Sequence, residues 1–161
     1  MKTIILPGYA LKNRKWANDT QKHLNNYSPA FVYNWKHWSA GKSEKNWIEK
    51  EAVRIAERFG SNKVNLLAKS IGTAVAMVII KTKPKLIAKV ILCGIPINDF
   101  LKGDEKHYNA LKTFPSDKLL CIQNKDDDHG TFQQVKKLIV PINPGIKIIS
   151  KPRSDHEYPY F

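Results

Sequence analysis

The sequence predicts one α/β domain, a three-layer sandwich in which helices cover a mainly parallel sheet of about six strands. Short apolar runs alternate with segments whose apolar residues recur every three or four positions, the pattern of strands alternating with amphipathic helices. Alternation at this spacing is typical of a parallel sheet with helices on both faces. The chain has 161 residues, 42% of them apolar, which suits one domain with a single core. We therefore expect a single domain over residues 1–161.

The first half of the chain begins with a strand and a helix. Residues 2–6 are an apolar run that ends at Pro7-Gly8, and residues 30–33 are a second short strand. Apolar residues at helical spacing predict two amphipathic helices, marked by Trp16, Thr20, His23, Leu24 and Tyr27 and then by Ile48, Ala52, Ile55 and Phe59. Gly60 is expected to end the second helix, because glycine commonly follows a helix.

The second half continues the alternation around a central strand at residues 64–67. Residues 71–80 are apolar on every side, which suits a helix packed under a sheet. Strands are expected at residues 86–93, 118–123 and 146–149, with one helix carrying Phe132, Val135, Leu138 and Ile139 before the last of them. Residues 95–117 are irregular, with one helix expected from about residue 98 to 111, and would form a minimal cap-like segment.

The formal net charge is +13, which could indicate a polyanionic partner such as nucleic acid. Only four of the 27 basic residues are arginine, namely Arg14, Arg54, Arg58 and Arg153. Arginine is the better residue for bidentate phosphate and base recognition, whereas scattered lysines usually form a solvated surface. The composition therefore argues against nucleic acid and leaves some attraction for an anionic small-molecule substrate.

No apolar run approaches the roughly 20 residues that a membrane-spanning helix requires. The apolar part of the N-terminus is too short for a secretory signal. Cys93 and Cys121 lie in apolar strand-like runs, and reduced core thiols are the simplest interpretation. These features predict a cytoplasmic protein, and they leave its oligomeric state open.

The central strand and the following helix meet in an abrupt turn, Ala68-Lys69-Ser70-Ile71-Gly72. A serine at this place is usually only a helix N-cap. The same layout also matches a nucleophile elbow, in which a strained strand-to-helix turn presents a serine hydroxyl above the sheet. Gly72 supplies the small residue that this turn needs, and Ala68 stands where the pattern has its first glycine.

Other loops at the same edge of the sheet supply the remaining groups of a hydrolase. Functional side chains collect beyond the carboxyl ends of parallel strands. The loop after the fifth expected strand contains Asp126, Asp127, Asp128 and His129, and the segment after the sixth contains Asp155 and His156. Serine, then an acid, then histidine is the chain order of the α/β hydrolases.

The sequence resembles the α/β-hydrolase superfamily, and within it the small, lid-poor serine hydrolases of the retinoblastoma-binding group. The matching stretches are ILPGYA at residues 5–10, LLAKSIGT at 66–73, IQNKDDDHGTF at 122–132 and SDHEYP at 154–159. The resemblance extends over essentially the whole chain. The resemblance implies a carboxylesterase-like enzyme that acts on a small acyl ester through a Ser-His-Asp triad and an acyl-enzyme, with no cofactor and no metal.

Within that scheme Ser70 is the candidate nucleophile and His156 the candidate general base and acid. The backbone N–H groups of Ile71 and Tyr9 are the candidate oxyanion-hole donors. Gly8, Trp35 and Trp38 are candidates for contact with the substrate, although tryptophans around this loop are equally expected to be packing residues.

Which aspartate orients the histidine is open at this level. The family pattern places the acid three residues after the small residue that ends the strand, which aligns Asn124 with Asp127. Asp126, Asp128 and Asp99 remain alternatives, the last because some hydrolases take the acid from the loop after the preceding strand. The aspartates with His129 could also be a solvated turn or a metal patch, but consecutive side chains diverge and seldom converge on one ion.

The chain ends five residues beyond His156, where relatives continue into a helix that supports the histidine loop. Tyr158, Tyr160 and Phe161 are the residues that could pack back and hold it. Without that support, catalysis would be poor, since a loosely held base costs heavily. Two alternatives to an enzyme therefore stand, namely a non-catalytic binding protein on a hydrolase scaffold and a polyanion-binding protein.

Overall fold

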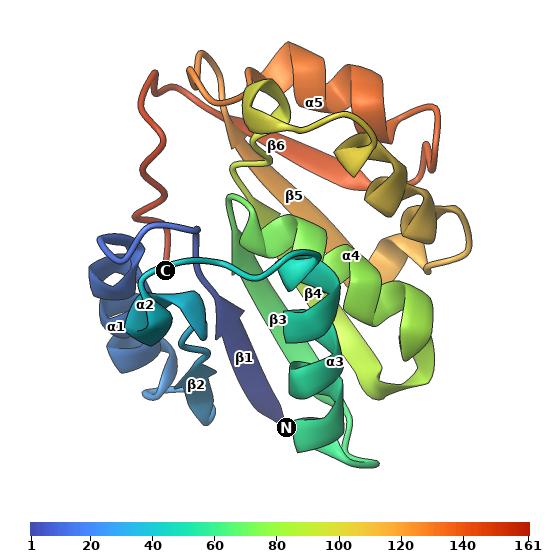
Figure 1. Ribbon diagram of the computed structural model, residues 1–161. Helices are drawn as coiled ribbons and strands as arrows, with labels where there is room; N and C mark the ends of the chain where they lie inside the picture. Colours follow the sequence, from blue (N-terminus) through green and yellow to red (C-terminus); the bar gives the residue numbers. More distant parts are fainter.

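The computed structural model describes residues 1–161, which form one six-stranded sheet with helices packed against it (Figure 1). The strands are β1 (Lys2–Leu6), β2 (Ala30–Val32), β3 (Val64–Lys69), β4 (Ile87–Cys93), β5 (Leu119–Asn124) and β6 (Lys147–Lys151). Their order is β2-β1-β3-β4-β5-β6, and every neighbouring pair is parallel. This confirms the predicted fold class.

The helices that follow these strands are α1 (Asn13–Leu24), α2 (His37–Ala40), α3 (Trp47–Phe59), α4 (Gly72–Thr82) and α5 (Phe132–Ile139). Short 3₁₀ segments connect the remaining elements: η1 (Pro84–Leu86), η2 (Ile97–Asp99), η3 (Asp104–Lys112) and η4 (Ser116–Lys118). None of the helices has the length and apolar character needed to cross a lipid bilayer.

The two faces of the sheet carry cores of very different size. Side chains alternate across a strand, so Ile4 and Leu6 face one side while Ile5 faces the other. The first side is a core of 28 buried residues shared with α3, α4, η3 and α5, whereas the second holds only 7. That smaller core is covered by α1 and by the C-terminal segment, which lies beside α1 in Figure 1.

The segment over residues 95–117 differs from the single helix expected there. It is built from η2, η3 and η4 instead of an α-helix. The segment is nonetheless anchored, because Tyr108, Leu111 and Phe114 are buried against the core that contains α4. The hydroxyls of Tyr108 and Thr73 are hydrogen-bonded at 2.6 Å, which ties η3 to the first turn of α4.

Both cysteines are buried as free thiols within the sheet. Cys93 ends β4 and Cys121 lies in β5. Burial raises the pKa of the Cys121 thiol to about 12, so the group stays protonated at neutral pH and is unreactive.

Candidate active site

Ser70 occupies a strained turn at the carboxyl end of the central strand. It follows β3 and precedes α4, and its φ of 57° lies in the left-handed region that residues with a side chain seldom adopt. Such a conformation costs of the order of 1–2 kcal/mol for a residue other than glycine, so surrounding contacts must maintain it. The Ser70 N–H donates to the Cys93 carbonyl at 2.9 Å, and the Thr73 hydroxyl donates to the Ser70 carbonyl at 2.6 Å.

Gly72 allows this turn to lie directly against β1. A Cβ atom at this position would collide with the backbone carbonyl oxygens of Leu6 and Pro7. Ala68 is also fully buried, at the position where the expected motif has its first glycine. The small residues around Ser70 therefore serve close backbone packing, as the elbow interpretation requires.

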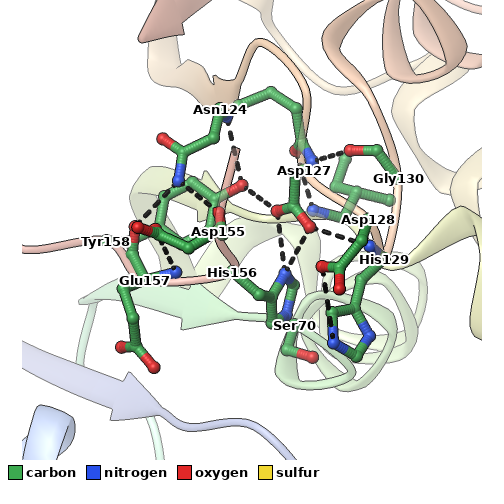
Figure 2. Close-up of polar contacts among 12 residues, drawn as sticks. Ser70, Asn124, Asp127, Asp128, His129, Gly130, Asp155, His156, Glu157 and Tyr158 are labelled. Carbon is green, nitrogen blue, oxygen red and sulfur yellow. Dashed lines mark hydrogen bonds and ion pairs between the residues drawn. The ribbon is translucent and has the colours of Figure 1, made fainter. Parts of the chain in front are cut away.

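His156, whose side chain is 15% exposed, pairs with the buried Asp127 beside this turn (Figure 2). The His156 Nδ1 lies 2.8 Å from Asp127 Oδ2 and 3.0 Å from Oδ1, and Asp127 has no exposed surface. An ionised carboxylate can only accept, so Nδ1 carries the proton and Nε2 of the neutral ring is left basic. Asp126 and Asp128 are exposed, and Asp99 contacts a different histidine, so of the four candidates only Asp127 meets His156.

The Nε2 atom of His156 is buried and has no hydrogen-bond partner in the protein. Figure 2 shows His156 between Asp127 and Ser70, with Ser70 on the far side of the ring from the carboxylate. The two residues share the end of β4 as a support, because Ser70 bonds to Cys93 and the His156 ring lies against Gly94. No hydrogen bond joins the Ser70 hydroxyl to Nε2 in this structure.

The N–H groups of Tyr9 and Ile71 donate to no acceptor in the protein, as an oxyanion site requires of its donors. The turn that carries Tyr9 is held by aromatic side chains from the segment after β2. Trp35 Nε1 donates to the Gly8 carbonyl at 3.1 Å, while His37 Nε2 and Trp38 Nε1 reach the Tyr9 carbonyl at 2.8 Å and 2.7 Å. These bonds hold the two carbonyls and so orient the peptide units of the turn.

Trp35 and Trp38, the candidates for contact with the substrate, bind the turn that carries Tyr9. Trp35 is 1% exposed, and neither tryptophan lines the cleft at Ser70. The indole N–H groups of both donate to backbone carbonyls of the turn at residues 8 and 9, so both rings support this turn. Gly8 is likewise absent from the lining, and Trp47 provides the aromatic side of the cleft together with Tyr9.

The cleft at Ser70 has a volume of about 470 Å³. Its lining combines apolar, aromatic and acidic side chains: Tyr9, Asn46, Trp47, Ile48, Glu49, Ser70, Ile71, Pro96, Asp99, Leu101, Asp104 and His107. Three carboxylates and no lysine or arginine are present, although the whole chain has 27 basic residues. The anionic substrate that the net charge suggested would meet no lysine or arginine in this lining.

A second histidine–aspartate pair, not foreseen from the sequence, lies against the first. His129 Nδ1 is 2.6 Å from Asp99 Oδ2, and the rings of His129 and His156 have centroids 4.2 Å apart. The sequence placed His129 in a solvated turn, and its side chain is indeed 42% exposed. Its contact with His156 depends on the loop geometry after β5, which no local pattern encodes. No three histidine, cysteine, aspartate or glutamate side chains gather as a metal site.

Lys69 is the other functional neighbour that sequence reasoning missed. It is 1% exposed, and its ammonium group lies 3.2 Å from Asn13 Oδ1 and 3.3 Å from Glu157 Oε2. Burial lowers the pKa of Lys69 below its usual value, and the negative charge of Glu157 opposes that shift. The ion pair connects the residue before Ser70 with the residue after His156.

Comparison of the sequence with protein families and with curated proteins gives no match. Comparison of the structure finds similar folds. An α/β hydrolase from a lagoon-sediment metagenome of Mar Chica, Morocco, has a TM-score of 0.72 at 14% identity, with 97% of this chain and 82% of that chain covered.

Two further solved structures are similar over nearly the whole chain. Mouse alpha/beta hydrolase domain-containing protein 10 gives a TM-score of 0.69 at 13% identity, covering 96% of this chain and 81% of that chain. A carboxylesterase structure from the thaumarchaeon Nitrososphaera gargenis gives 0.63 at 14% identity, covering 96% and 82%. This chain therefore has the α/β-hydrolase fold.

Proposed function

We propose that this protein is a serine hydrolase that cleaves a small acyl ester, with Ser70, His156 and Asp127 as its triad. The observation that carries the proposal is the meeting of three loops at one sheet edge. A serine in a strained strand-to-helix turn lies beside a half-buried histidine (Figure 2). The Nε2 atom of this histidine has no hydrogen-bond partner, and its Nδ1 atom is held by a buried carboxylate. The esterase named among the similar structures supports the same class of reaction.

In the proposed reaction, His156 Nε2 removes the proton of the Ser70 hydroxyl as its oxygen attacks the acyl carbonyl. Asp127 holds the ring with its Nδ1 proton inward and stabilises the imidazolium that forms. The N–H groups of Tyr9 and Ile71 would stabilise the oxyanion, and His156 would return the proton to the departing alcohol. Water then repeats the sequence on the acyl-enzyme and releases the acid.

The Ser70 and His156 side chains must come into hydrogen-bonding contact for the first step. Such bonds are often long in structures without substrate and tighten when substrate binds. The cap-like segment 95–117 would form one wall of the substrate cleft, since it contributes Pro96, Asp99, Leu101, Asp104 and His107 to the lining.

The direct test is labelling by a fluorophosphonate probe, which reacts with an activated serine. We expect the wild-type protein to be labelled and Ser70→Ala to lose labelling completely. Ser150→Ala is the matched control, because Ser150 is exposed on β6 away from the cleft and should leave labelling unchanged. Hydrolysis of p-nitrophenyl acetate and butyrate should follow the same order.

The absent Ser70–His156 hydrogen bond favours one second candidate, a binding protein that retains the hydrolase scaffold without turnover. A folded wild-type protein that neither takes up the probe nor hydrolyses these esters would support that candidate. Ester hydrolysis that persists in Ser70→Ala would remove Ser70 as the nucleophile.

A further inference from the structure

Tyr158 is fully buried although it lies in an irregular segment close to the end of the chain. Its hydroxyl contacts two groups, the backbone N–H of Asn124 at 3.1 Å and the Oδ2 atom of Asp127 (Figure 2). A backbone N–H can only donate, so the phenol oxygen accepts from Asn124 and its single proton must be directed to Asp127. The phenol is therefore the donor, and Asp127 the acceptor, in the bond between them.

Asp127 has no exposed surface, and no lysine or arginine pairs with it. Its carboxylate accepts from three donors: the His129 N–H at 2.9 Å, the Tyr158 hydroxyl and His156 Nδ1. The first two are neutral and reach different oxygens, so together they fix the plane in which His156 meets the carboxylate. An isolated buried charge is costly, and these neutral donors offset that cost.

Contacts with α1, β5 and the end of β4 hold Tyr158 and its neighbours in place. Trp16 Nε1 on α1 donates to the Tyr158 carbonyl at 2.9 Å. The Asn124 side-chain amide donates to the carbonyls of Asp155 and Glu157, both at 2.8 Å. At Gly94 a Cβ atom would come within 2.5 Å of Tyr158 and 3.0 Å of His156, so both rings lie against the same backbone.

We propose that Tyr158 is a positioning residue of the active site, whose hydroxyl fixes the Asp127 carboxylate and thereby sets the basicity of His156. The inference rests on the proposed function, in which Asp127 and His156 act as acid and base. When the phenol donates to the carboxylate, less of the negative charge is available to stabilise the imidazolium. Loss of that donor should therefore make His156 more basic and move its protonation to higher pH.

Tyr158 is suited to this role at every working pH. Burial, and the neighbouring carboxylate of Asp127, raise the pKa of its phenol well above the usual value, so the donor proton remains. Other charged or titratable groups also face His156 or flank it, and a test must separate Tyr158 from them. They are Asp127, His129 with Asp99 and Asp128, Glu157 paired with Lys69, and Asp155 paired with Arg153.

The test is the titration of His156 by NMR in histidine-labelled protein, measured in the wild type and in Tyr158→Phe. We expect the His156 midpoint to rise by about half to one pH unit in the variant, and the pH profile of probe labelling to shift in the same direction. The labelling rate should fall about tenfold, because the carboxylate is no longer fixed. The midpoint of His23, an exposed histidine on α1, serves as an internal reference in the same spectra.

Tyr160→Phe is the matched control, because Tyr160 donates to Asn124 Oδ1 at 2.6 Å and does not touch Asp127. It should leave the His156 midpoint unchanged.

If Tyr158→Phe does not fold, 3-fluorotyrosine at position 158 keeps the ring and the hydrogen bond but donates more strongly, so the His156 midpoint should fall. An unchanged midpoint in either Tyr158 variant, or an equal shift in Tyr160→Phe, would overturn the proposal. The titration requires no turnover, so absence of wild-type labelling would instead count against the proposed function.

Discussion

Gly72 is the residue at which the turn that carries Ser70 has no room for a side chain. Its φ is not positive, so its requirement is space and not backbone conformation. The obstructing atoms are the carbonyl oxygens of Leu6 and Pro7, which belong to the backbone and cannot rotate away. A side chain here would have to displace β1 and with it the turn that carries the Tyr9 N–H.

Gly72→Ala should therefore destabilise the protein by about 1–3 kcal/mol, the usual range for an overpacked site. Gly41→Ala is the comparison, because Gly41 ends α2 in the left-handed region with a φ of 76° and has open space around its Cβ position. Its cost should be about 1 kcal/mol from backbone strain alone. Urea unfolding of both variants measures the difference, and an equal cost would contradict the close-packing explanation. Labelling at Ser70 should also slow in Gly72→Ala only.

At the scale of elements, an ion pair between a buried lysine and an exposed glutamate joins β3 to the C-terminal segment. Lys69 lies at the end of β3 with 2% of its side chain exposed, whereas its partner Glu157 is 62% exposed. Burial removes most of the water around the Lys69 ammonium group. Attraction to the solvent-exposed Glu157 carboxylate compensates for only part of this desolvation energy. The pair is thus better explained as a tether for the His156 loop than as a source of stability.

Lys69→Met tests that explanation, because methionine fills much of the same space without the charge. The free energy of unfolding should stay within about 1 kcal/mol of the wild type or increase, because the mutation removes the desolvated charge and leaves Glu157 in water. The C-terminal residues should become more accessible to carboxypeptidase, and ester turnover should fall. Lys89→Met, at an exposed position on β4, should change none of these. A C-terminus as protected as in the wild type would rule out the tether.

Periodicity predicted the strands and the main helices because each buries a continuous apolar stripe, as β3 and α3 do. The expected strand ends and the chain order made Ser70 and His156 candidates, and the choice of Asp127 came from the resemblance to the α/β-hydrolase pattern. The contacts that support them are not local. Trp16 and Tyr158 are 142 residues apart, and Lys69 and Glu157 are 88 apart. The 3₁₀ segments over 95–117 have no helical stripe, so no pattern predicted their form.

At the scale of the molecule, the net charge and the cleft have opposite signs. The +13 charge comes from lysines spread over the surface, while Glu49, Asp99 and Asp104 line the cleft without a lysine or arginine partner among them. The Debye length at physiological ionic strength is about 8 Å, so remote lysines are screened more strongly than carboxylates beside a bound substrate. Local charge should then decide which acyl groups the cleft accepts.

An ester with an anionic acyl chain, such as a succinate half-ester, should therefore be hydrolysed with a kcat/KM about tenfold below that of the neutral butyrate ester. Each exposed carboxylate is worth a few tenths of a kcal/mol to 1 kcal/mol, and three of them together give this factor. Added salt should raise the rate for the anionic ester, because it screens the repulsion. Asp104→Asn should narrow the gap, and Asp117→Asn, the same change at an exposed acid outside the cleft, should leave it unchanged. If the surface lysines governed the encounter instead, the anionic ester would be the better substrate and salt would slow it.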